Sequence, residues 1–208
     1  MNLKHIFSNI FLSKNSINLK TYDAGIDDYV KKSNKNIEGN KKIWIDTALW
    51  LIQKTDLIFE IGSGPWLDAD YMETQWYRVV RSDASKWFIE YQKNLWKNII
   101  FYDVSLPTPL SQKFSLVYCN LVLQHFPKSN LQKLLQNISQ ILSPEWYLAL
   151  GIKLWEWEKW EYDKLNLPRY FSYYSEIEFE DELKKVWYKK VFSVIENKIY
   201  SHTIFQKF

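Results

Sequence analysis

A short glycine-containing turn between an apolar run and a following helix carries the clearest chemical signal in the sequence. The segment Ile58–Trp66 reads IFEIGSGPW, and Gly62 and Gly64 directly follow the apolar run. Glycines at such a place let the backbone approach a ligand closely, and the next helix offers its free N–H groups. The turn therefore predicts a cradle for a nucleotide-like ligand.

The spacing within this turn narrows the class of ligand. A dinucleotide-binding fingerprint reads G-x-G-x-x-G, but Leu67 stands where the third glycine belongs. Glu60 lies two residues before Gly62, so the segment fits the pattern E-x-G-x-G, or E-x-G-x-G-x-G if Trp66 stands for glycine. A dehydrogenase or another nucleotide-cofactor enzyme is the alternative that this mismatch disfavours.

Two aspartates end the next two predicted strands. Asp83 closes YRVVRSD, and a carboxylate at this place can accept hydrogen bonds from both hydroxyls of a ribose. Asp103 closes IIFYD. Either acid alone is more often a helix N-cap or a loop residue. Together with the glycine turn they predict ligand binding at one edge of a sheet.

The elements that position these residues follow from the hydrophobic pattern. Strands are predicted over 56–61, 77–83, 98–104, 114–123, 146–154, 188–196 and 199–207, and helices over 41–53, 84–95, 130–142 and about 175–186. A polar loop is predicted over 155–168. Alternating strands and helices indicate a parallel sheet covered on both faces. The short connection between the last two strands requires an antiparallel hairpin.

Composition limits the class of protein. The chain has 208 residues, 47% hydrophobic and 25% charged, which fits one globular domain. The net charge of +3 is spread along the chain and does not indicate nucleic-acid binding. No apolar stretch is long enough to span a membrane, and residues 1–18 show no secretion signal, although a surface amphipathic role is an alternative for them. The single Cys119 fits a reducing, cytoplasmic location.

The tryptophan and glycine counts are inverted. The chain has 11 Trp and 5 Gly, where average usage gives about 15 glycines. Eight tryptophans stand at turn, cap or loop positions that favour glycine: Trp66, Trp76, Trp87, Trp96, Trp146, Trp155, Trp157 and Trp187. One hypothesis is that the gene uses UGA as a glycine codon and is translated here with tryptophan. The alternative is a protein that is truly rich in tryptophan.

The turn, the two acids and the terminal hairpin together resemble the class I methyltransferases that use S-adenosylmethionine. The resemblance covers residues 20–208 approximately, with 1–18 as an N-terminal extension and 19–208 as a single methyltransferase domain. It implies an α/β fold with a Rossmann-like, doubly wound sheet of seven strands in the order 3-2-1-4-5-7-6, mostly parallel with a C-terminal antiparallel hairpin. TYDAGIDDY, LSPEWYLAL and LPRYFSYY are similar to the branch that methylates small molecules.

The resemblance also implies roles for particular residues. The cofactor would contact Glu60, Gly62, Ser63, Gly64, Asp83, Asp103, Val104 and Asn120. An acceptor lid would contain Tyr22, Tyr29, Arg169 and Tyr170, and Arg169 would pair with an anionic substrate. His125 is the candidate general base, with packing under Phe126 as its structural alternative. No histidine has partners at metal-ligand spacing, so no metal is expected.

The function implied is methyl transfer from S-adenosylmethionine to a small-molecule acceptor by in-line displacement, in which positioning supplies much of the rate. Two other classes stay open at this point. One is a protein that binds S-adenosylmethionine without catalysis, which a literal Trp66 in the cofactor turn would favour. The other is the nucleotide-cofactor enzyme named above.

Overall fold

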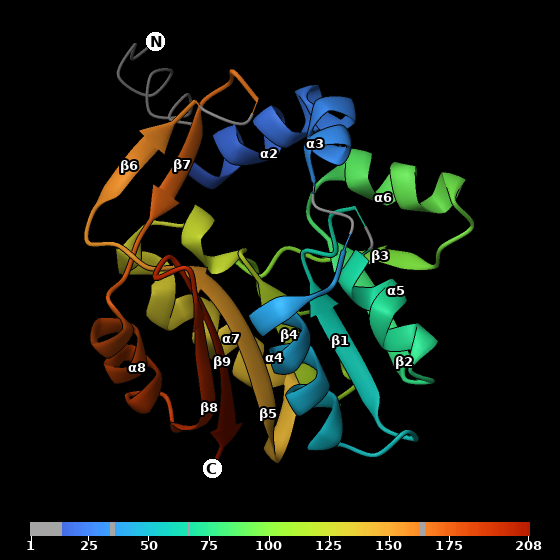
Figure 1. Cartoon of the computed structure of the whole chain (residues 1–208), viewed down its shortest axis with the longest axis vertical. Coiled ribbons are helices and arrows are strands. Elements are labelled where there is room, and N and C mark those ends of the chain that lie inside the picture. Colours follow the sequence, from blue (N-terminus) through green and yellow to red (C-terminus); the bar gives the residue numbers. More distant parts are fainter. Residues whose placement is uncertain (1–13, 34–35, 66, 163–164) are drawn as a thin grey trace, which may run out of the picture.

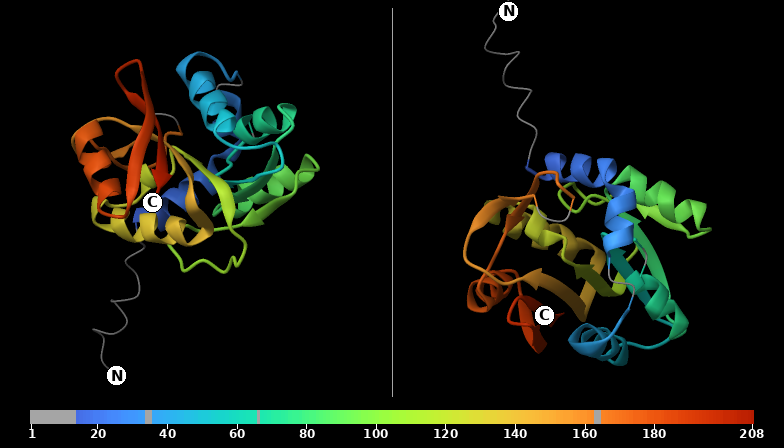
Figure 2. Two further views of the ribbon diagram at one scale, coloured as in Figure 1. Left: turned by 90° about the horizontal axis from the view of Figure 1, so that it is seen from below. Right: turned by 45° about the horizontal axis from the view of Figure 1, so that its top comes forward.

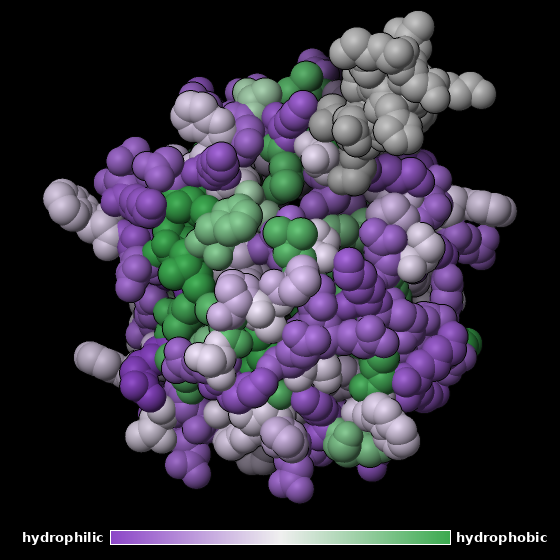
Figure 3. All heavy atoms as spheres, turned by 180° about the vertical axis from the view of Figure 1, so that it is seen from behind, coloured by the Kyte–Doolittle hydropathy of each residue, from purple (hydrophilic) through white to green (hydrophobic). Residues whose placement is uncertain are grey.

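The computed structural model describes residues 14–33, 36–65, 67–162 and 165–208. Its centre is a twisted sheet flanked by helices, with α2 (Lys14–Ala24) and α3 (Ile26–Lys32) lying across one end of it (Figure 1). None of the described helices combines the length and the apolar character needed to cross a membrane. The face seen from behind is largely hydrophilic, with hydrophobic side chains gathered in patches (Figure 3).

The sheet has the predicted strand order. Its strands are β1 (Leu57–Ile61), β2 (Arg78–Asp83), β3 (Ile99–Phe101), β4 (Phe114–Asn120), β5 (Leu142–Lys153), β8 (Tyr188–Glu196) and β9 (Tyr200–Lys207). They run in the order β3-β2-β1-β4-β5-β9-β8. The first five are parallel, and β9 is antiparallel to both β5 and β8. With the strands renumbered, this is the order 3-2-1-4-5-7-6, so the expected α/β fold is confirmed.

Successive strand residues point to opposite faces of the sheet, and each face packs against its own helices. On β1, Phe59 and Ile61 belong to the core that contains α7 (Leu131–Ile141) and α8 (Glu176–Lys184). Ile58 points the other way, to the core that contains α4 (Gly39–Trp50) and Met72 of α5 (Leu67–Thr74). The sheet is therefore buried on both faces, which explains why its strands read as near-continuous apolar runs.

The predicted loop over 155–168 is partly wrong. Residues Glu158–Glu161 form β6, which pairs antiparallel with β7 (Arg169–Ser172) in a separate two-stranded sheet. The sequence EKWE of β6 lacks alternating apolar residues, and three of its four residues are exposed. The strand is held by backbone pairing with the buried β7, a cause that a hydrophobic pattern does not register.

Helix α2 and strand β7 lie together over the sheet end from which β1, β2 and β4 emerge (Figures 1 and 2). Asn18 joins the two elements: its amide nitrogen donates to the Tyr170 carbonyl at 3.0 Å, and its amide oxygen accepts from the Tyr170 N–H at 2.7 Å. The Thr21 hydroxyl donates to the Pro168 carbonyl at 2.7 Å. Helix α2 runs continuously across residues 18 and 19, where the sequence analysis divides the chain, and that division stays a prediction.

Candidate functional site

The glycine turn directly follows β1 and adopts a backbone that other residues strongly disfavour. Gly62 has φ of 72° and Gly64 has φ of 50°. A Cβ atom at Gly62 would overlap Cγ2 of Val122, which follows β4 and lies against the glycine turn. The Ser63 N–H donates to the Ser82 carbonyl of β2 at 2.8 Å, which ties the turn to the neighbouring strand. Gly62 is therefore required by both its conformation and its surroundings.

A buried glutamine supports this turn from α6 (Lys86–Asn94), and the sequence analysis did not single it out. The Gln92 amide nitrogen donates to Ser63 Oγ at 2.9 Å and to the Gly64 carbonyl at 2.8 Å. Its oxygen accepts from Nη1 of buried Arg81 at 3.5 Å. The sequence did carry a signal, because Gln92 continues the buried stripe of Phe88 and Ile89 at helical spacing, where an amide needs partners.

Asp83 ends β2 beside the turn. Its carboxylate accepts from the Gly64 N–H at 2.9 Å and from the Ser85 N–H at 2.8 Å. Burial raises the pKa of Asp83 to about 6, and the backbone hydrogen bonds oppose that rise. Ser85 caps α6, and its hydroxyl donates to Asp23 of α2 at 2.5 Å. The predicted ribose carboxylate thus lies next to the glycine turn and is linked through Ser85 to the overlying helix.

Asp103 and Val104 follow β3 at the same edge. The Asp103 carboxylate accepts from the N–H and from the hydroxyl of Ser105, at 2.9 and 2.7 Å. Val104 is buried, and both residues line the cavity described below. Asp103 therefore holds its own turn as well as facing the site.

Glu60 and Asn120 bring two polar groups to the carboxyl ends of β1 and β4. Burial raises the pKa of Glu60 to about 8, and the nearby Asp68 adds to the rise. Within the part of the chain that the structure describes, Glu60 Oε2 and Asn120 Oδ1 are buried acceptors without a hydrogen-bond donor. Buried acceptors are costly to leave without a donor. Asn120 Oδ1 lies against Gly151 of β5, so Glu60 Oε2 is the atom that marks a place for a ligand that donates a hydrogen bond.

Asp68 and Lys41 complete this wall, and the sequence analysis missed both. Asp68, in the first turn of α5, accepts from the Tyr118 hydroxyl at 2.8 Å and from the Asn120 amide at 3.0 Å. Lys41 of α4 pairs with it at 2.5 Å. Neither residue belongs to the glycine turn or to a strand end, which is where the sequence analysis looked for site residues.

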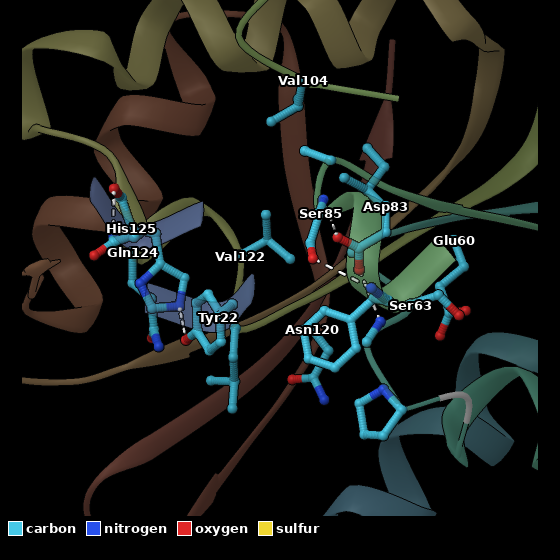
Figure 4. Close-up of a pocket in the computed structure, with 18 of the residues that line it drawn as sticks. Tyr22, Glu60, Ser63, Asp83, Ser85, Val104, Asn120, Val122, Gln124 and His125 are labelled. Atoms are coloured by element: carbon cyan, nitrogen blue, oxygen red, sulfur yellow. Dashed lines mark hydrogen bonds between the residues drawn. The ribbon is translucent and has the colours of Figure 1, made fainter. Parts of the chain in front are cut away.

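The other end of the cavity holds a hydrogen-bonded tyrosine and histidine. The Tyr22 hydroxyl lies 2.9 Å from Nε2 of His125, and Nδ1 of His125 lies 3.1 Å from the Tyr170 carbonyl oxygen (Figure 4). A carbonyl can only accept, so Nδ1 carries the hydrogen and Nε2 of the neutral ring accepts from Tyr22. Burial lowers the pKa of His125 to about 4, so the imidazole is neutral near pH 7.

Of the four predicted acceptor residues, three line the cavity. Tyr22 and Tyr29 meet edge to face with ring centroids 5.2 Å apart, and Arg169 of β7 is buried with its guanidinium over the Phe171 ring at 5.0 Å. The prediction for the Tyr170 side chain is wrong, because its hydroxyl accepts from Lys14 at 3.1 Å outside the cavity. Alternate strand residues point to opposite sides, so Arg169 and Phe171 face inward and the intervening side chain does not.

Both groups of residues line one cavity of about 410 Å³, a size typical of small-molecule sites. All eight predicted cofactor residues line it: Glu60, Gly62, Ser63, Gly64, Asp83, Asp103, Val104 and Asn120. Figure 4 shows Glu60, Ser63 and Asp83 on one side and Tyr22 and His125 on the other. We call these the cofactor end and the acceptor end. The described residues contain no cluster of three or more side chains suited to a metal ion.

Comparisons with known proteins agree with this geometry. The model of the family described as "Methyltransferase domain" matches residues 42–189, which is more than half of the chain. No curated protein sequence matches.

Several solved structures share the fold. The Burkholderia thailandensis 1,6-didemethyltoxoflavin-N1-methyltransferase, solved with 1,6-didemethyltoxoflavin and S-adenosylhomocysteine, is 15% identical, with a TM-score of 0.70 over 100% of this chain and 91% of that one. The DhpI–SAH complex is 13% identical, with a TM-score of 0.67 over 94% and 97%. A Methanosarcina mazei SAM-dependent methyltransferase is 15% identical, with a TM-score of 0.65 over 77% and 96%. With the family match over residues 42–189, the chain belongs to the family of methyltransferase domains.

Proposed function

We propose that this methyltransferase acts on a small-molecule acceptor, which binds at the acceptor end and receives the methyl group by in-line displacement. The observation that carries the proposal is that one cavity joins the glycine turn to the Tyr22–His125 pair. An acceptor held there would lie next to the cofactor, and holding two reactants in line supplies a large part of the rate. Methyl transfer to a small molecule is therefore the chemistry that this arrangement favours.

The residues of the cofactor end fit S-adenosylmethionine. When bound, this cofactor supplies a methyl group on a positively charged sulfur. Gly62 and Gly64 leave room for close backbone approach, and Asp83 would accept from ribose hydroxyls. Glu60 Oε2, which lacks a donor among the described residues, suits an ammonium group, whose positive charge would favour the ionised form of this carboxyl. Asp83 and Asp103 also line this end, and Asp68 is paired there with Lys41.

The cover over the acceptor end supports a small acceptor. Helix α2 and strand β7 are joined by the hydrogen bonds of Asn18 and Thr21 described above, and Asn18 also donates to the His125 carbonyl at 3.2 Å. This cover forms part of the wall of the cavity of about 410 Å³. A cavity of that size suits a small molecule.

The Tyr22–His125 pair provides a route for the proton that the acceptor loses. The acceptor proton would pass to the Tyr22 oxygen while the Tyr22 proton passes to Nε2 of His125, which accepts in the observed tautomer. The Tyr170 carbonyl then stabilises the ring through Nδ1–H. In this proposal His125 is the base, and Tyr22 is the group that touches the acceptor.

The first experiment is a calorimetric titration with S-adenosylhomocysteine, followed by measurement of its formation from S-adenosylmethionine with a panel of small molecules. Binding with turnover supports the proposal. Binding without turnover by any member of a broad panel favours the non-catalytic alternative. A fluorescence titration with a reduced nicotinamide cofactor is the control, because tight binding of that compound would favour the dehydrogenase alternative.

We also propose that the suspect tryptophans are glycines in the native protein, and the conformation at three of them supports this. Trp76, Trp96 and Trp187 follow the ends of α5, α6 and α8 with φ of 67°, 60° and 65°. They are 85%, 97% and 67% exposed. The left-handed conformation at this position favours glycine, and a tryptophan pays about 1–2 kcal/mol for it without burying its ring. Glycine at these three codons, through UGA, removes that cost.

The other five positions lend less support. Trp87 lies in the first turn of α6, and neither Trp155 nor Trp157 has a positive φ. Trp146 lies within β5, and the positive φ there belongs to Glu145, at 66°. Trp66 lies outside the described residues.

Peptide mass spectrometry of protein from its native organism tests this proposal. Glycine at 76, 96 and 187 is the expected result, and tryptophan-containing peptides there would contradict it. In the chain as printed, each change of Trp76 or Trp96 to glycine should raise the free energy of unfolding by about 1 kcal/mol. The matched control is Trp87→Gly, which should lower it by about as much because a glycine within a helix is destabilising.

A further inference from the structure

Charged side chains are unevenly distributed along the cavity. The four acids that line it come from β1, α5, β2 and the turn after β3, all at the cofactor end. No acidic side chain of the described α2, η1 (Leu123–His125) or β7 residues lines it. Lys41 also lines the cofactor end, where it pairs with Asp68 at 2.5 Å, and the cations Arg169 and Lys153 line the acceptor end. At the acceptor end a ligand would therefore meet cations and no acid among the described lining residues.

The two cations of the acceptor end share one aromatic side chain. The Arg169 guanidinium lies over the Phe171 ring at 5.0 Å and the Lys153 ammonium at 4.7 Å, and the His125 ring is 4.8 Å from Phe171 between centroids. Arg169 is buried, so its charge is screened little by water. These contacts hold two positive charges beside His125.

Nearby acidic charge offsets these cations only in part. Glu161 of β6 lies 3.7 Å from Lys153, but it also pairs with Lys159 at 3.1 Å, and it does not line the cavity. The field at His125 reflects this balance. After burial, the charges of Arg169 and Lys153 both lower the pKa of His125, while Glu161 opposes them. Arg169 and Lys153 thus both act on the electrostatics at His125.

We infer that the acceptor carries a negatively charged group, a carboxylate or a phosphate, which Arg169 and Lys153 bind beside the Phe171 ring. The inference rests on the proposed function, because it assigns the substrate class of that same site. A guanidinium binds such groups through two parallel N–H donors, and a lysine adds a second charge. The anion fixes one end of the acceptor, and the atom to be methylated faces Tyr22.

The test compares benzoate with benzamide on the protein saturated with S-adenosylhomocysteine, using ligand-observed NMR titrations. The two probes share an aromatic ring that suits the Tyr22, Tyr29 and Phe171 side chains, and they differ in charge. Benzoate should bind at least about tenfold more tightly, since hydrogen bonds to a charged group are the stronger ones. Equal affinities, or no binding of either probe, would overturn the inference.

Variants locate the effect. Arg169→Gln should reduce benzoate affinity to that of benzamide, with benzamide and S-adenosylhomocysteine affinities unchanged. Arg169→Lys keeps the charge and should retain part of the preference. The matched control is Lys159→Gln, an exposed lysine next to the same Glu161 that should leave the benzoate preference intact. If the change at Arg169 prevents folding, two measurements still test the inference. One is the ratio of benzoate affinity to benzamide affinity in the wild type, and the other is the same ratio in Lys153→Gln, which should be lower.

Different results would contradict the proposed function and the anionic acceptor. Absence of S-adenosylhomocysteine binding by the folded wild-type protein contradicts the proposed function itself. Normal binding of that compound without a preference for benzoate contradicts only the anionic acceptor. The same titrations with phenyl phosphate distinguish a carboxylate site from a phosphate site.

Discussion

The cofactor end of the cavity is built from neighbouring strands of one sheet, whereas the acceptor end is built from segments far apart in the chain. Gly64 and Asp83, which are hydrogen-bonded at the cofactor end, are 19 residues apart. Tyr22 and His125 at the acceptor end are 103 residues apart, and Asn18 and Tyr170 in its cover are 152 apart. The first end depends on the turn that follows each strand, and the second depends on how α2 and β7 dock.

This contrast extends to the chemistry of the two ends. The cofactor end contains two glycines with left-handed backbone, the carboxyl groups of Glu60, Asp83 and Asp103, and the Lys41–Asp68 ion pair. The acceptor end contains aromatic rings, a neutral histidine and two cations. Substitutions at the two ends should therefore separate into changes of cofactor affinity and changes of acceptor turnover.

The largest effect is expected at the glycine turn. In Gly62→Ala the added Cβ overlaps Val122 and the backbone keeps its left-handed conformation, so S-adenosylhomocysteine affinity should fall at least about a hundredfold. The matched control is Gly39→Ala, which has φ of 58° but nothing within 4 Å of the new Cβ. It should cost about 1 kcal/mol of stability and leave affinity unchanged. Calorimetry and thermal unfolding measure both, and equal losses of affinity would contradict this account.

At the acceptor end, Tyr22→Phe removes the hydroxyl that His125 accepts from and keeps the ring. Turnover of an acceptor found in the panel should fall by about a hundredfold, the usual scale of acid–base assistance. Affinity for S-adenosylhomocysteine should change less than about twofold, because binding the cofactor does not use the hydroxyl. Tyr29→Phe is the control, since no proton route passes through it. If S-adenosylhomocysteine affinity fell as much as turnover in Tyr22→Phe, the two ends would not have separate roles.

The pH dependence of cofactor affinity sharpens the comparison. Asp83 has a pKa of about 6, so its ionised fraction falls about tenfold between pH 7 and pH 5. The carboxylate is the form that accepts hydrogen bonds, so affinity falls as the pH falls through 6. The loss between pH 7 and 5 should therefore be about tenfold smaller in Asp83→Asn than in wild type. Identical profiles for the two proteins would exclude a role for the carboxylate.

Protonation of Asp83 lowers cofactor affinity but raises the stability of the ligand-free protein. The folded pKa of about 6 lies above the ordinary value of 3.8 for an aspartate. Between these values the folded state binds more protons than the unfolded state, so this group favours folding as the pH falls. Thermal unfolding of wild type against Asp83→Asn over this range measures the difference.

The smallest effect on the site is expected at Gln92, which supports the glycine turn through hydrogen bonds and does not belong to the cavity lining. Gln92→Leu removes the two donors to Ser63 and Gly64 and should lower the free energy of unfolding by about 1–3 kcal/mol. Cofactor affinity should fall several-fold and acceptor turnover at saturating cofactor should not change. Gln136→Leu, on the exposed face of α7, is the matched control. If the two variants behave alike, Gln92 does not position the turn.

The comparison also explains how far the sequence could be interpreted. The glycines and strand-ending acids line one cavity, as the sequence predicted, because a parallel sheet brings the carboxyl ends of neighbouring strands to one edge. Gln92, Asp68 and Lys41 were missed because their roles depend on which helix face meets the turn. The Tyr170 prediction was wrong because neighbouring strand residues point to opposite sides, and β7 itself was not predicted.

The sequence by itself determined the alternation of strands and helices, the terminal hairpin and the glycine turn, since these follow from hydrophobic periodicity and from local backbone conformation; the strand order came from the family resemblance. Only the tertiary structure decided that α2 and β7 cover the site, that His125 accepts from Tyr22, and that Arg169 and Lys153 line the same cavity as the glycine turn. Those features depend on contacts between distant segments, whose geometry is set by packing and hydrogen bonding rather than by any local pattern.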